Sequence, residues 1–184
     1  MNRHSILGIS GSLRREATNR KLVREAARLY GDVDYAEAEL NMPLYDGDLE
    51  AEQGIPIEAL RLADQIRGAD AVIISCPEYN KAITGALKNA LDWVSRVDGN
   101  PWLDKPVAVM SANAGRTGGE TGQFTVRHAL TPFRPSIATG PAVMIASAHK
   151  EFDDDGRLLN ERSVATLTAL MEALRRDATA KMAQ

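Results

Sequence analysis

The stretch SGSLRREATN, residues 10–19, follows the apolar run ILGI at residues 6–9 and precedes a helix-patterned run at residues 20–30. The apolar run predicts a buried strand, and the later run carries apolar residues at helical spacing. A loop between a strand and a helix presents free backbone N–H groups and the positive end of the helix dipole to one point. The donors and charges in this loop are Ser10, Ser12, Arg14, Arg15, Thr18 and Asn19. The stretch therefore predicts a phosphate site at the start of the first helix.

The loop lacks two known phosphate-binding motifs, and their absence limits which phosphate-containing ligands fit it. No Gly-Lys-Ser/Thr follows it, which argues against a nucleoside triphosphate. Gly8 and Gly11 do not begin a G-x-G-x-x-G pattern, which argues against a dinucleotide as the tightly held group. A monophosphate fits the residues better. The alternative from the residues alone is a capped turn with exposed arginines.

Strand-like and helix-like segments alternate along the chain. The expected strands cover residues 5–10, 33–40, 71–75, 107–112 and part of 142–146. The expected helices cover residues 19–30, 56–67, 85–96, 123–133 and 163–181, the first capped by Thr18 or Asn19. Such alternation predicts a parallel sheet with helices on both faces. The acidic segment 33–40 is expected at a sheet edge, and residues 41–55 as a long irregular connection.

Three polar or glycine-rich loops follow predicted strands, at residues 11–18, 76–84 and 113–122. The carboxyl ends of parallel strands lie at one edge of a sheet, so these loops should meet there and form a binding site. The second loop contains PEYN, residues 77–80, which offers an aromatic ring and hydrogen-bonding groups. The glycines of the third loop allow close approach to a flat ring. Together the loops suit a monophosphate carried on a planar heterocycle, although each loop alone could be an ordinary turn.

Composition excludes several classes of partner. The formal net charge of -3 and the scattered basic residues argue against nucleic-acid binding. No stretch approaches the roughly 18 apolar residues of a membrane span, and no secretory signal is recognisable. Cys76 is the single cysteine, as expected in a reducing cytoplasm, and the three histidines lack metal-ligand spacing. We expect one cytoplasmic domain, residues 1–184, with no bound metal.

Three motifs together resemble the NADPH-dependent FMN reductase family. They are GSLR at residues 11–14 with Asn19 five positions on, PEYN at residues 77–80, and GALKNALDW at residues 85–93. The family includes bacterial quinone and chromate reductases and some azoreductases. The resemblance extends from residue 6 through the last helix. It implies a flavodoxin-like three-layer sandwich with a five-stranded parallel sheet, and a tightly held FMN.

The resemblance also implies roles for particular residues. The 5′-phosphate of FMN would be held by Ser12, Arg14, Thr18 and Asn19, with Ser10 nearby. The ring and ribityl chain would be flanked by Pro77, Glu78, Tyr79 and Asn80. The other edge of the ring would contact Ser111, Ala112, Asn113 and Gly115. No side chain is expected to be catalytic, since the flavin carries the chemistry. Members of the family commonly pair through the helix that follows PEYN, so a homodimer or homotetramer is expected.

The expected activity is oxidation of NADPH or NADH, with hydride passed to FMN and electrons then passed to an acceptor. Quinone, chromate, an azo compound or free flavin are candidate acceptors. Two alternatives stay open: a flavodoxin-type electron carrier without turnover of its own, and an enzyme for which FMN is a diffusing substrate. The mild net charge disfavours a carrier that docks by electrostatic steering.

The sequence departs from the family pattern at three places. Thr18 stands where serine is usual and keeps the hydroxyl group. Thr84 replaces a frequent proline, which should leave its loop less constrained, and Lys81 is either solvated or directed into the cleft. Cys76 is expected to be a small buried side chain, with a redox role as the alternative.

Overall fold

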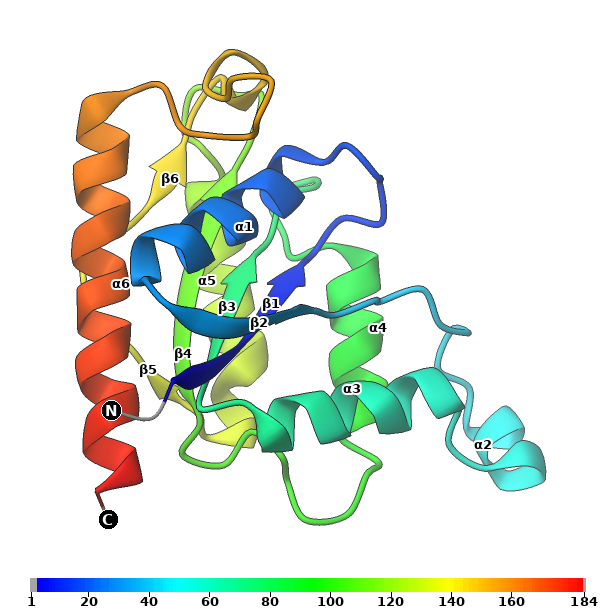
Figure 1. Cartoon of the computed structure of the whole chain (residues 1–184). Helices are drawn as coiled ribbons and strands as arrows, with labels where there is room; N and C mark the ends of the chain where they lie inside the picture. The colour runs from blue at the N-terminus through cyan, green and yellow to red at the C-terminus, as the bar shows by residue number, and fades with distance from the viewer. Residues whose placement is uncertain (1–2, 184) are drawn as a thin grey trace.

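A computed structural model describes residues 3–183, and Figure 1 shows a twisted sheet with helices on both of its faces. The strands are β1 His4–Ser10, β2 Val33–Glu37, β3 Ala71–Ser75, β4 Pro106–Ala112, β5 Ser136–Ile137 and β6 Met144–Ile145. The α-helices are α1 Thr18–Tyr30, α2 Gly47–Gln53, α3 Ile57–Gly68, α4 Gly85–Val94, α5 Glu120–Leu130 and α6 Glu161–Met182. Thr131–Phe133 and Ala148–Lys150 form short 3₁₀ helices. None of the helices in residues 3–183 combines the length and apolar character that crossing a membrane requires.

The sheet has the order β2-β1-β3-β4-β5, and every pair of neighbouring strands is parallel. The prediction of a flavodoxin-like parallel sheet is therefore confirmed, with β2 at the edge as expected. The fifth position is divided between two segments. β5 pairs with the start of β4 at Pro106 and Val107, whereas β6 pairs with its end at Ser111 and Ala112.

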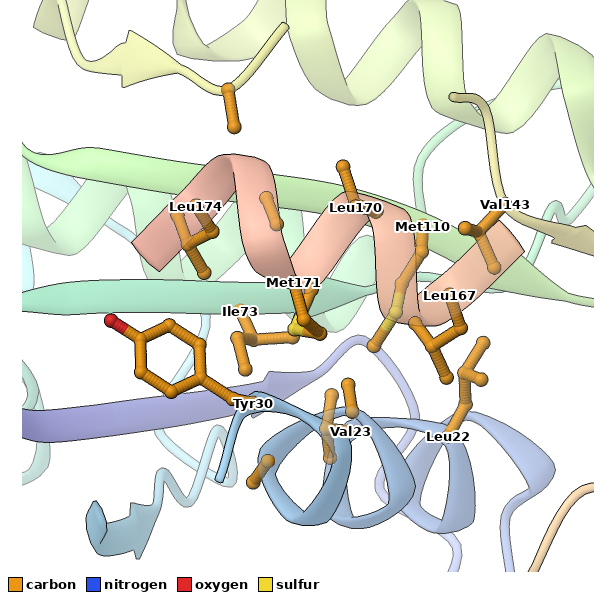
Figure 2. Packing of buried hydrophobic residues seen from close by; sticks show 14 of the residues in the cluster. Leu22, Val23, Tyr30, Ile73, Met110, Val143, Leu167, Leu170, Met171 and Leu174 are labelled. Atoms are coloured by element: carbon orange, nitrogen blue, oxygen red, sulfur yellow. The ribbon is translucent and has the colours of Figure 1, made fainter. Parts of the chain in front are cut away.

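Two clusters of apolar side chains fill the space on either side of the sheet. Successive strand residues alternate between them, because neighbouring side chains of a strand point to opposite faces. Ile6 and Ile73 pack under α1 and α6, while Leu7 and Ile74 pack against α3, α4 and α5. Figure 2 shows the first cluster, in which Tyr30 of α1 lies near Ile73 and α6 closes the layer. The three-layer prediction thus follows from the alternation along the strands.

Several expected boundaries were wrong. Residues 41–55 are not irregular throughout, since they contain α2, which buries none of its residues and so carries no apolar stripe to detect. Its signals are local: Asp46 accepts a hydrogen bond from the Asp48 N–H at 2.9 Å, and Gly54 ends the helix. β2 ends at Glu37 rather than residue 40, and the C-terminal helix begins at Glu161 rather than residue 163.

The expected cap of α1 was also wrong. Ala17 is the N-cap residue, and no side chain caps the first turn of the helix. Asn19 is 2 % exposed, and its amide instead joins two strands. Its Nδ2 donates to the Ala112 carbonyl at 2.8 Å, and its Oδ1 accepts from the Ala112 N–H at 3.0 Å and from the Ser75 hydroxyl at 2.8 Å. One side chain therefore holds the start of α1 against the ends of β3 and β4.

Replacement of Asn19 by alanine should lower the free energy of unfolding by about 3 kcal/mol. Three buried polar groups lose their partner, and each such loss costs roughly 1–3 kcal/mol. Urea denaturation followed by circular dichroism measures the change. Asn41→Ala is the control, because Asn41 is exposed and its substitution should shift stability by less than about 0.5 kcal/mol. A variant as stable as the wild type would contradict the role of the amide.

The burial of Tyr30 predicts that the free energy of unfolding falls in alkaline solution. Burial raises the pKa of Tyr30 to about 12, and its hydroxyl group is hydrogen-bonded to His4. The native protein thus retains a proton that the unfolded chain releases near pH 10. The stabilisation is present below pH 10 and is lost as the pH rises through about 12. Urea unfolding midpoints of Tyr30→Phe should fall less steeply across this range than those of the wild type. Some slope should remain, because burial also raises the pKa of Tyr35.

Candidate functional site

A cavity of about 540 Å³ lies at the carboxyl ends of β1, β3 and β4. Its lining comes from the three predicted loops and from one further segment. From the first loop and α1 come Ser12, Arg14, Glu16, Ala17, Thr18, Asn19 and Lys21. The later loops and the further segment contribute Pro77, Glu78, Tyr79, Ala112, Asn113, Ala114, Gly115, Ala148, His149 and Phe152. The prediction that the loops after the strands meet at one edge of the sheet is confirmed, and they line one cavity there.

The first loop presents an uncapped helix terminus to this cavity. α1 has neither a capping side chain nor an acidic residue in its first turn, so its leading N–H groups have no side-chain acceptor in the described chain. Ser12 and Thr18 bring hydroxyl groups to the same wall, and Arg14 brings a guanidinium. Hydroxyl groups and free N–H groups at a positive helix end, with one arginine, are the donors that a phosphate monoester needs. This wall therefore fits the phosphate of FMN.

The second loop contains a tight turn at the rim of the cavity. Tyr79 and Ala82 exchange both backbone hydrogen bonds at 3.1 Å, which leaves Asn80 and Lys81 as the two central residues. Both have positive φ, 52° and 66°, an arrangement that favours glycine or asparagine and is strained for lysine. Tyr79 is 52 % exposed and lines the cavity, so its ring is available to a bound ligand.

Glu78 precedes this turn and faces away from solvent, with 8 % of its side chain exposed. Its Oε2 accepts a hydrogen bond from the Gly122 N–H at 3.0 Å, and its Oε1 lies 3.2 Å from the Lys81 ammonium. The Gly122 N–H and the nearby Lys81 charge hold the pKa of the Glu78 carboxyl below its usual value, because both stabilise the charged form. Lys81 is thus paired with Glu78 and does not line the cavity.

Three of the predicted contact residues do not line the cavity. Ser10 is buried, and its hydroxyl accepts from the Ser12 N–H at 3.3 Å, which shapes the first loop. Ser111 is buried as well, and its hydroxyl donates to the Gly118 carbonyl at 2.6 Å. Asn80 occupies the strained turn outside the lining. The other predicted residues all line the cavity, and their contacts with a cofactor remain predictions.

One wall of the cavity was missed from the sequence. Ala148, His149 and Phe152 line it, and they belong to the segment that follows β6. This segment is held by Asn113, whose carbonyl accepts from the Ala148 N–H at 3.0 Å. β6 pairs with the carboxyl end of β4, so residues after it also reach the same edge of the sheet. Applying the rule for loops after parallel strands to residues 142–146 would have found this wall.

Thr84, which stands where proline is frequent in the family, constrains the first loop. Its hydroxyl donates to the Gly11 carbonyl at 2.7 Å and accepts from the Leu87 N–H at 3.3 Å, so it ties the phosphate wall to the start of α4. Cys76 lies behind it, with the sulfur 3.7 Å from the Thr84 hydroxyl. Burial raises the pKa of the Cys76 thiol, which keeps it protonated and favours the structural interpretation.

Comparisons with known proteins agree with this geometry. The family model for NADPH-dependent FMN reductases matches residues 4–150. An NAD(P)H-dependent FMN reductase of Pseudomonas aeruginosa is 38% identical over 172 residues, with 92% of each chain covered. A quinone reductase of Escherichia coli is 31% identical over 172 residues, covering 91% of this chain and 92% of the relative.

A solved structure has the same fold over nearly the whole chain. The flavoenzyme FerB of Paracoccus denitrificans, an NAD(P)H:(acceptor) oxidoreductase, superposes with a TM-score of 0.82 at 28% identity. The match covers 96% of this chain and 98% of that one. The chain therefore belongs to the NADPH-dependent FMN reductase family, and it is a flavodoxin-like oxidoreductase that uses FMN with NAD(P)H.

Proposed function

We propose that the chain transfers electrons from NAD(P)H to a quinone through FMN held in the cavity at the strand ends. The observation that carries this proposal is the pairing of two unlike walls: an uncapped helix terminus with Arg14, and an exposed aromatic turn at Tyr79. A phosphate needs the first wall and a flat ring needs the second. Relatives named quinone reductase, such as that of Escherichia coli, favour a quinone over the other acceptors.

The phosphate wall binds and orients the cofactor in this proposal. The N–H groups at the start of α1 and the hydroxyl groups of Ser12 and Thr18 would donate hydrogen bonds to the phosphate, and Arg14 would neutralise its charge. Asn19 holds the start of α1 beside the phosphate, because its Oδ1 and one hydrogen of its Nδ2 bond to Ser75 and Ala112. The anchored phosphate leaves the rest of the cavity to the ring.

The remaining walls orient the ring and offer hydrogen-bond donors to the negative charge that the ring gains on reduction. FMN supplies the hydride chemistry when it is bound. Tyr79 covers one side of the cavity, while Ala114 and Gly115 line another. Within residues 3–183, neither the Ala114 N–H nor the Gly115 N–H donates to another group of the chain. Both can therefore donate to a ligand that gains negative charge on reduction.

The predicted homodimer or homotetramer also belongs to this proposal. α4 buries most of its apolar stripe within the subunit and exposes an ion pair between Lys88 and Asp92. Leu44 and Phe124 are 79 % and 66 % exposed, and they supply apolar surface that a second copy could cover.

Replacement of Arg14 by alanine should weaken FMN binding at least tenfold, because a charge-assisted hydrogen bond to phosphate is lost. Quenching of FMN fluorescence on titration with the full-length chain gives the dissociation constant. Riboflavin, which lacks the phosphate, should bind the variant and the wild type equally. Arg15→Ala is the matched control, since Arg15 is exposed and lies outside the cavity lining. Unchanged flavin content in purified Arg14→Ala would contradict the phosphate assignment.

The purified protein should show flavin absorbance and should oxidise NADPH rapidly only when a quinone is supplied. Parallel assays with chromate, an azo dye and free FMN rank the acceptors, and NADH replaces NADPH in a second series. A colourless protein that saturates with added FMN would identify FMN as a diffusing substrate. Absence of NAD(P)H oxidation with every acceptor would exclude the enzyme and leave a flavin-binding module.

A further inference from the structure

Asn113 holds the second loop through the backbone of Glu78. The Asn113 Oδ1 accepts from the Glu78 N–H at 2.8 Å, and its Nδ2 donates to the Glu78 carbonyl at 3.0 Å. The side-chain amide of Asn113 thus pairs with the backbone N–H and the backbone carbonyl of Glu78, as the backbone of a neighbouring strand would. The backbone of Asn113 is itself fixed, because its N–H donates to the Ile145 carbonyl at 2.9 Å. The second loop is therefore joined to β4 and β6 at one residue.

The side chain of Glu78 makes a separate connection, to α5. α5 has Gly119 as its N-cap residue and no capping side chain of its own. The Glu78 carboxylate accepts from the Gly122 N–H in the first turn of this helix, and a negative charge is favourable at that end. The packing is close: a Cβ added at Gly122 would lie 2.9 Å from the Glu78 Cβ. α5 is thus capped from a different segment of the chain.

The residue held in this way precedes the strained turn. Asn80 and Lys81 keep their positive φ angles although only the two bonds between Tyr79 and Ala82 close the turn. Such conformations persist where the surroundings impose them. Lys81, one of the two central residues of the turn, also pairs with the carboxylate of Glu78, the residue that precedes the turn. The position of Tyr79 at the cavity rim depends on these contacts.

We propose that Glu78 is a positioning residue for the flavin ring: its carboxylate links the first turn of α5 to the Tyr79 turn and holds the ring wall in place before the cofactor binds. The inference rests on the proposed flavin site and assigns the side chain a role distinct from contact with the ring. A preformed wall lowers the ordering cost of binding. Glu78 should then affect affinity for the ring and not affinity for the phosphate.

Riboflavin separates these two contributions. Glu78→Ala should weaken binding of FMN and of riboflavin by the same factor, about tenfold, since a buried acceptor for a helix N–H is lost. Arg14→Ala should weaken FMN alone. Glu78→Gln keeps an oxygen acceptor for the Gly122 N–H, so it should restore both affinities to within about threefold of the wild type. Fluorescence quenching with the full-length chain measures the dissociation constants of both flavins for the wild type and the three variants.

A matched control tests whether any lost helix cap has the same effect. Asp46 caps α2 by accepting from the Asp48 N–H at 2.9 Å, and it lies outside the cavity lining. Asp46→Ala should lower the melting temperature without changing riboflavin affinity. Equal losses of affinity in Asp46→Ala and Glu78→Ala would overturn the proposal, as would wild-type riboflavin binding by Glu78→Ala.

A second substitution covers the case in which Glu78→Ala does not fold. Gly122→Ala keeps the carboxylate but forces Glu78 away from α5, because the added Cβ would lie 2.9 Å from the Glu78 Cβ. It should weaken both flavins in parallel, and unchanged riboflavin binding would overturn the proposal. Failure of the wild type itself to bind either flavin would instead reject the proposed function, so the two failures are distinguishable.

Discussion

The amide of Asn19 is the interaction on which the rest of the site depends. This side chain bonds to Ala112 and to Ser75, so it holds the start of α1 against the ends of β3 and β4. The N-cap residue of α1 is Ala17, so no side chain caps the first turn of the helix. The free N–H groups and the strand ends are thereby brought to the same cavity. One buried side chain thus fixes the start of the helix whose uncapped end forms a wall of the cavity.

The sequence was sufficient for the parts of the fold that rest on apolar pattern. β3 was predicted with its observed bounds because a β-branched run leaves little choice, and the meeting of the loops followed from parallel topology. α2 could not be found this way, since it buries no residue. The wall at His149 and Phe152 was missed because the rule for loops after parallel strands was not applied to the short strand expected within residues 142–146.

Several side chains that the sequence assigns to the site also hold its loops together. Asn19, Ser111 and Glu78 were all expected to contact a cofactor, and in the structure their polar atoms also bond to other parts of the chain. Thr84, a departure from the family pattern, likewise provides a bond to Gly11. A hydroxyl, amide or carboxylate at the end of a strand can bind a ligand or hold a loop, and only the partner atoms decide between these roles.

The uncapped first turn of α1 has a thermodynamic consequence. A ligand that bonds to groups exposed only in the folded chain stabilises it by mass action, by about 2.7 kcal/mol at a concentration one hundredfold above the dissociation constant. The free energy that a capping side chain would supply permanently is here supplied by whatever anion occupies the cavity. The abundance of folded protein in a cell would then follow the supply of flavin, so the same wall that orients the cofactor also makes turnover of the protein responsive to it.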